Sequence, residues 1–68
     1  MSSTVVANGK TVEVPVPCTL EALLEALGQR PRSVVVELNG EAVAPSEFTL
    51  RRVNAGDRLE IVRIVAGG

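Results

Sequence analysis

The chain is poor in the residues that most often carry enzyme chemistry. It has no histidine, tryptophan or tyrosine, and Phe48 is its only aromatic residue. Histidine is the commonest general base and the commonest metal ligand. The chain therefore lacks the residue that most often forms an acid/base site or a metal site. One phenylalanine provides no stacking platform for bases, and a net charge of −1 provides no basic surface for a phosphate backbone. Nucleic acid is therefore not an expected partner.

Cysteine and long apolar runs are scarce as well. The single cysteine, Cys18, excludes an internal disulfide and says little about the compartment. Its place before a predicted helix could lower its pKa, but no histidine is there to activate it, and a packed or surface thiol without a role is the better interpretation. No apolar run approaches the roughly 20 residues that span a membrane. Residues 1–4 lack the features of a signal peptide, so we expect a cytoplasmic protein without a membrane partner.

The acidic residues show no spacing typical of a metal site or of an acid/base pair. There are eight of them, and most are expected to lie on a solvated surface. Four arginines (Arg51, Arg52, Arg58 and Arg63) could form a modest basic patch near the end of the chain, although exposed strand faces are the better interpretation. We therefore expect no catalytic residue, no metal and no bound cofactor, and we do not expect an enzyme.

What the chain does contain is enough apolar sequence for one core. It has 68 residues, of which 46% are hydrophobic, mostly valine and leucine. This size and composition predict a single domain over residues 1–68 and argue against disorder. Residues 4–7 and 10–14 are rich in strand-forming residues and flank Asn8-Gly9. Asn-Gly favours a type I′ turn, which needs positive φ at both central residues, so we expect a hairpin.

Residues 19–27 predict the main helix. Its leucines recur at helical spacing, at positions 20, 23, 24 and 27. Thr19 is a plausible N-cap, Gly28 is placed to end the helix, and Pro31 prevents its continuation. The apolar stripe must pack on something, and the only available partner is a sheet.

The remaining elements are short. In order we expect a central strand (33–38), an Asn39-Gly40 turn, a return strand (41–43), an irregular connection with one helical turn (44–48), a short strand (49–53), a turn (54–57) and a last strand (58–65). The fold class is α+β, with one main helix packed across one face of a mixed sheet of about four to five strands. The segment between the second and third strands is long enough for a crossover.

The chain ends with Ala66-Gly67-Gly68. A frayed terminus is the common fate of such an ending. The other interpretation is a flexible tail over residues 66–68 that is thin enough to be threaded into the active site of a partner, since glycine permits close approach. A terminal carboxylate has a pKa of about 3.5, so at neutral pH it is a poor electrophile until another enzyme activates it.

Three stretches carry a resemblance to a known family. They are Leu38-Asn39-Gly40-Glu41, the segment 43–48 with a proline and then an aromatic residue, and Gly56-Asp57-Arg58 leading through the last strand to Gly67-Gly68. Over essentially its whole length the chain resembles the ThiS family, the sulfur carrier proteins of thiamine biosynthesis, which have the ubiquitin-like β-grasp fold. Two positions depart from the family pattern. Ser46 stands where a basic residue often follows the proline, and Phe48 replaces the usual tryptophan.

The resemblance implies a carrier that acts as a substrate of partner enzymes. An E1-like adenylyltransferase of the ThiF type would use ATP and magnesium to adenylate the carboxylate of Gly68. Sulfur, ultimately from a cysteine desulfurase, would then leave a thiocarboxylate, and a thiazole synthase of the ThiG type would take this sulfur for the thiazole ring. Ala66 and Gly67 would thread into narrow channels of the partners, and the sheet surface beside the tail would be the docking face.

Three alternatives remain open. One is a sulfur carrier like the small subunit of molybdopterin synthase, although those chains are usually longer and richer in aromatic residues. Another keeps the tail but uses it in a different sulfur pathway, or as a ubiquitin-like modifier joined to lysines through Gly68. The third is a plain interaction domain, for which removal of Gly67 and Gly68 would leave the function intact.

Overall fold

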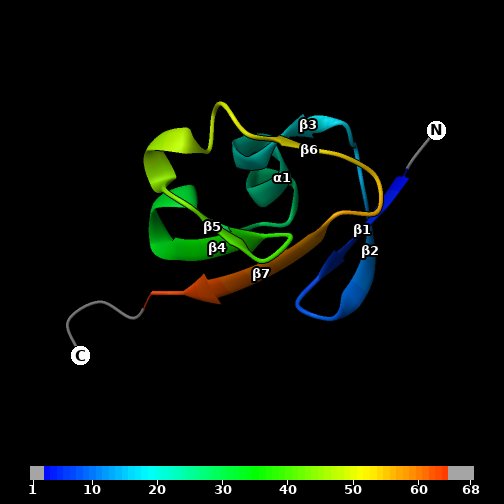
Figure 1. The fold of residues 1–68 in the computed structure, drawn as a ribbon, viewed down its shortest axis with the longest axis horizontal. Helices are drawn as coiled ribbons and strands as arrows, with labels where there is room; N and C mark the ends of the chain where they lie inside the picture. The colour runs from blue at the N-terminus through cyan, green and yellow to red at the C-terminus, as the bar shows by residue number, and fades with distance from the viewer. Residues whose placement is uncertain (1–2, 65–68) are drawn as a thin grey trace.

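The computed structural model describes residues 3–64, and its centre is a five-stranded mixed sheet with one helix across one face (Figure 1). The strand order is β2-β1-β7-β4-β5, and β3 and β6 form a separate two-stranded sheet. The elements in chain order are β1 (Ser3–Ala7), β2 (Lys10–Val14), β3 (Cys18–Thr19), α1 (Leu20–Ala26), the 3-10 turn η1 (Pro31–Ser33), β4 (Val34–Leu38), β5 (Glu41–Val43), the 3-10 turn η2 (Pro45–Glu47), β6 (Arg52–Val53) and β7 (Arg58–Arg63). The α+β class and the mixed sheet are as the sequence predicts.

The first hairpin forms at the predicted turn. Asn8 and Gly9 have φ values of 52° and 81°, the left-handed pair that a type I′ turn requires. The antiparallel register then runs from the Ala7–Lys10 pair to the Ser3–Val14 pair. The local chemistry of Asn-Gly thus sets the register of the whole hairpin.

Helix α1 begins and ends at the predicted caps. The Thr19 hydroxyl accepts a hydrogen bond from the Ala22 amide at 3.1 Å, which satisfies one free donor of the first turn. At the other end the Gly28 amide donates to Glu25 and the Gln29 amide to Leu24, the two bonds of a Schellman motif. Gly28 has φ = 76°, a conformation that glycine adopts without strain.

The core lies between α1 and the sheet. Leu20, Leu23 and Leu24 of the helix are fully buried, and Leu27 packs against the cluster at its edge. Phe48 is 2% exposed and fills the space under η2, so the interpretation of this residue as a core plug is confirmed. Strand residues complete the cluster: Val5, Val14, Val16, Val34, Val36, Leu38, Val43, Val53, Leu59 and Ile61.

Strand β7 lies in the middle of the main sheet. It pairs in parallel with β1, and in antiparallel register with β4 from the Leu38–Leu59 pair to the Val34–Arg63 pair. Strand β4 alternates buried and exposed residues although it begins with three valines, so it is covered on one face only. The strand that leads to the chain end is therefore held on both sides, and one of its faces is left open.

Three expected boundaries are corrected. Ser33 belongs to η1 and precedes the third strand. Of residues 49–53, only Arg52 and Val53 form a strand, because the amides of Leu50 and Arg51 both bond back to the Glu47 carbonyl. Strand β7 ends at Arg63, two residues before the predicted end, and position 65 lies outside the described residues.

The helices within residues 3–64 are too short, or too polar, to cross a membrane.

Candidate functional site

The predicted site residues, Ala66, Gly67 and Gly68, lie outside the described residues. The structure does describe the chain that leads to them, as far as Ile64. The Ile64 amide donates a hydrogen bond of 2.8 Å to the Ser33 carbonyl, which continues the β4–β7 pairing beyond the last strand residue. We call Ile64 the root of the predicted tail. This hydrogen bond fixes the root beside Ser33, the residue before β4.

Asn8 holds the middle of β7 from the β1 side. Its backbone amide donates to the Leu59 carbonyl at 2.9 Å. Its side-chain amide donates to the Ile61 carbonyl at 3.0 Å and accepts from the Ile61 amide at 2.7 Å. Because an asparagine side chain offers a donor and an acceptor as a peptide group does, it extends the β1–β7 pairing beyond the end of β1.

Asn39 performs a similar task at the start of β7. Its backbone amide donates to the Arg58 carbonyl at 2.7 Å, and its side-chain oxygen accepts from the Arg58 amide at 2.9 Å. Its side-chain amide also donates to Asp57, whose other oxygen accepts from the Asn54 amide at 2.8 Å. The Asn39-Gly40 and Gly56-Asp57 motifs, far apart in sequence, thus meet in one hydrogen-bonded corner that fixes where β7 begins.

The sheet has an open face on the side away from α1 (Figure 1). We use this name for Val35, Glu37, Glu60, Val62 and Ile64. Val35 and Val62 are direct partners in the β4–β7 register and are 52% and 61% exposed. Ile64, next on this face, is 52% exposed. Three of the four large exposed apolar residues in the described chain therefore gather beside the root of the tail.

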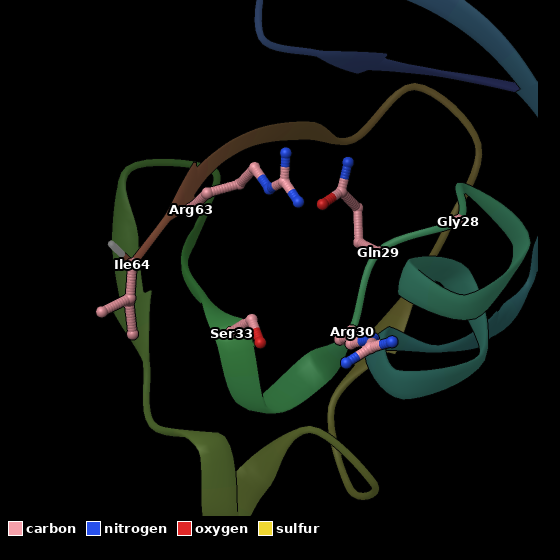
Figure 2. Close-up of a pocket in the computed structure, with 6 residues that line it drawn as sticks. All are labelled: Gly28, Gln29, Arg30, Ser33, Arg63 and Ile64. Atoms are coloured by element: carbon pink, nitrogen blue, oxygen red, sulfur yellow. The ribbon is translucent and has the colours of Figure 1, made fainter. Parts of the chain in front are cut away.

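A polar hollow of about 480 Å³ lies on the other side of the root. It is lined by Gly28, Gln29, Arg30, Ser33, Arg63 and Ile64. Figure 2 shows the polar ends of Gln29 and Arg63 reaching toward one another across the hollow, while Ile64 points away from it. The described chain buries no polar or charged residue, so the polar groups of this hollow are accessible to water.

The arginines near the end of the chain do not gather into a basic patch. Arg51 pairs instead with Glu41 at 2.8 Å and with Glu47 at 4.0 Å, away from β7. Arg58 and Arg63 occupy opposite ends of β7, so only Arg63 stands beside the root. Arginines close in sequence are separated here because strand geometry and local ion pairs direct them to different surfaces.

Cys18 does not have the lowered pKa that its position suggested. It lies in β3, paired with Val53, and is partly buried. Burial raises the pKa of the Cys18 thiol because the thiolate loses hydration there, and the nearby Arg52 charge lowers it by less. The thiol is therefore poorly suited to act as a nucleophile. Within residues 3–64 no three metal-binding side chains lie close enough together to hold an ion.

Sequence reasoning missed the exposure of Val62 and the hydrogen bonds by which the side chains of Asn8 and Asn39 hold β7. We call these two side chains the asparagine clamps. The sequence identifies Asn8 and Asn39 as turn residues, and nothing in their spacing reveals that their side chains reach β7. Val62 could have been found, because residues 58–62 alternate between polar and apolar until Val62 takes the polar side. A single exposed aliphatic residue is normal, and Val62 indicates a contact site only because Val35 and Ile64 extend it into a patch.

Comparison of the sequence and the fold with known proteins indicates one family. The sequence model of the ThiS family matches residues 3–68. A thiazole synthase from Paramagnetospirillum magneticum is 44% identical over 63 residues, which cover 93% of this chain and 19% of that protein. The chain therefore spans about a fifth of the length of this relative.

Two solved structures have the same fold. The crystal structure of a thiamine biosynthesis protein (ThiS) from Geobacter metallireducens superposes with a TM-score of 0.80 at 32% identity, covering 96% of this chain and 99% of that one. A solution structure of a thiamine biosynthesis protein from the same organism gives 0.76 at 34% identity, with 96% and 87% covered.

Proposed function

The chain belongs to the ThiS family, and on that premise we propose that it is a sulfur carrier protein that supplies the sulfur of the thiazole ring of thiamine. The observation that carries the proposal is the family match over residues 3–68, which includes Gly67-Gly68. The likeness to a thiamine biosynthesis ThiS structure over almost its full length supports it. The relative named as a thiazole synthase supports the same pathway.

In this proposal the reacting group is the α-carboxylate of Gly68. One carboxylate oxygen attacks the α-phosphorus of magnesium-bound ATP in a ThiF-type activating enzyme, and pyrophosphate leaves. The product is an acyl adenylate, which is a far better electrophile than the carboxylate. A cysteine desulfurase supplies the sulfur as a persulfide, whose terminal sulfur attacks the acyl carbon while AMP leaves. A thiol then cleaves the resulting acyl disulfide, which yields the thiocarboxylate and a disulfide. The resulting thiocarboxylate gives its sulfur to a thiazole synthase of the ThiG type.

The folded part of the chain would present the tail and recognise the enzymes. Strand β7 is held by β1, β4, Asn8 and Asn39, so the root at Ile64 has a fixed place relative to the open face. Ala66 and Gly67 would enter the narrow channel before Gly68. Catalysis belongs to the partners, and this chain acts as their substrate.

The proposal is tested by the intact mass of the protein before and after incubation with the cognate activating enzyme, a sulfur donor and MgATP. We expect the mass change of one oxygen replaced by sulfur, with fragmentation locating it at Gly68. Fragmentation is needed because oxidation of Met1 or Cys18 gives almost the same nominal change. A variant that lacks Gly67 and Gly68 is the control, and it should fold normally and stay unmodified.

The outcome for the wild type decides between the candidate functions. An unmodified Gly68 with a competent cognate enzyme would contradict the carrier proposal. If the thiocarboxylate forms, incubation with thiazole synthase should consume it. Consumption by a molybdopterin synthase large subunit, with none by thiazole synthase, would assign the carrier to that other pathway.

A further inference from the structure

Two carboxylates, which form no ion pair within residues 3–64, face each other on the open face. Glu37 of β4 and Glu60 of β7 are direct partners in the antiparallel register, and both are exposed. Within residues 3–64 neither of them forms an ion pair. Like charges placed directly opposite on a sheet are destabilising. The fold therefore carries a repulsive pair on the same face as its apolar patch.

The acidic pair and the apolar patch are neighbours. Val35 and Val62 form the next exposed pair along the same two strands, two residues from the carboxylates, which is roughly 7 Å along each strand. Arg58, two residues before Glu60, belongs to the same side of β7 but does not pair with either carboxylate. In the other direction Ile64 continues the apolar patch toward the tail.

We propose that Glu37 and Glu60 together receive a lysine or arginine side chain of the activating enzyme, while Val35, Val62 and Ile64 contact an apolar surface beside it. This inference rests on the proposed function. Gly68 is four residues beyond Ile64, and an extended chain spans at most about 3.6 Å per residue, or about 14 Å in total. An enzyme that reacts at Gly68 therefore has its active site within that distance of Ile64, so part of its surface lies close to Ile64, where the open face ends.

The apolar and acidic side chains of the open face indicate what kind of surface would bind there. Covering Val35 and Val62 with an apolar surface is favourable, but covering two carboxylates without a partner is costly. A guanidinium group can bond both carboxylates at once, and it would convert their repulsion into attraction. A second copy of this chain, docked through the same face, would bring two carboxylates and only one cation, Arg58, so carboxylates would outnumber cations in such a dimer and self-association fits this surface less well.

The test compares steady-state adenylation of the wild type with a double variant, Glu37→Gln with Glu60→Gln. We expect the KM for the carrier to rise about tenfold, with kcat within about twofold, because the lost contacts are distant from the reacting carboxylate. The salt dependence of KM should weaken as well. The control is Glu25→Gln, an exposed glutamate on α1, which should keep the wild-type constants.

A stability measurement separates docking from folding. Because the double variant removes a repulsion, its thermal midpoint should equal or exceed that of the wild type. A double variant with KM within about twofold of the wild type would overturn the inference and leave the proposed function standing. A wild-type dimer that the double variant strengthens would also overturn it, since a second copy would then cover the face. If the wild type is not adenylated at all, the proposed function fails, and this inference fails with it.

Discussion

Asn8 and Ile61 exchange two hydrogen bonds, one from the Asn8 side chain to the Ile61 carbonyl and one from the Ile61 amide to the Asn8 side chain. The two residues are 53 positions apart in sequence. A side chain from the first hairpin turn therefore takes the place of a strand backbone beside β7. The root of the predicted tail thus depends on a residue near the opposite end of the chain.

Replacing Asn8 by glycine should destabilise the domain by about 1–3 kcal/mol. Glycine accepts φ = 52° at this position, so the loss isolates the two side-chain hydrogen bonds from backbone strain. Urea unfolding measures the change, and hydrogen exchange of the Ile61 amide should accelerate. Asn54→Gly is the control, because it adds the same chain entropy while its side chain forms no hydrogen bond with another described residue. Equal losses for the two variants would contradict this role of Asn8.

The corner at the start of β7 gives a second prediction. Both carboxylate oxygens of Asp57 accept hydrogen bonds, one from the Asn39 side chain and one from the Asn54 amide. Asp57→Asn replaces one of these oxygens by a donor that faces a donor, so we expect a loss of about 1–2 kcal/mol in urea unfolding. Asp57→Glu keeps the charge but moves the oxygens, and it should be destabilised as well. If the urea midpoints of both variants equal that of the wild type, the hydrogen-bonded corner does not hold β7.

Local chemistry predicts part of this fold well. Asn8-Gly9 identifies the first hairpin because the turn requires positive φ, and the leucine spacing with Thr19 and Gly28 identifies α1 because helix ends need partners for their free backbone groups. These features depend on neighbours in sequence. For that reason they can be predicted without knowledge of the tertiary structure.

The missed features depend on residues that are distant in sequence. The β3–β6 pair is only two residues long on each side, too short for any period to show, and it forms because the segments after β2 and η2 are brought together. The exposed place of Val35 is hidden by the valines on both sides of it. The clamps of Asn8 and Asn39 require that β7 lie beside both turns. The open face, the part of the candidate site that the structure describes, can therefore be seen as a whole only in the assembled sheet, although the alternation of β7 already indicates that Val62 is exposed.

Cys18 should react slowly with iodoacetamide. Because burial raises the pKa of its thiol, the thiolate fraction at pH 8 is smaller than that of an ordinary cysteine, and the rate should keep rising as the pH increases past the usual value of 9.0. Arg52→Gln removes the charge that lowers this pKa, so its rate should be lower still. Free glutathione measured in parallel gives the reference. A faster reaction in the Arg52 variant would contradict this electrostatic assignment.

Phe48 is expected to contribute a large part of the free energy of folding. It is 2% exposed in a domain whose total stability is roughly 3–10 kcal/mol at this size. Phe48→Ala should cost about 3–5 kcal/mol, a large part of that margin, whereas Phe48→Leu should cost about 1–2 kcal/mol because less volume is lost. Circular dichroism during thermal unfolding measures both. An alanine variant with a midpoint near that of the wild type would show that η2 can collapse into the space.

Gly67→Trp should leave the fold unchanged and block activation. Gly67 lies outside the described residues, so the expectation follows from the proposed threading of the tail and from the lack of a side chain in glycine. The rate of adenylate formation at Gly68 should fall by at least about a hundredfold, which corresponds to about 2.7 kcal/mol of lost transition-state stabilisation. Gly67→Ala adds one methyl group, and its rate of adenylate formation should lie between the rates of the wild type and of Gly67→Trp. Because the thermal midpoint reports on residues far from position 67, it should be the same in all three proteins. Normal activation of the tryptophan variant would refute the narrow channel, and the tail would then have to be recognised from the open face alone.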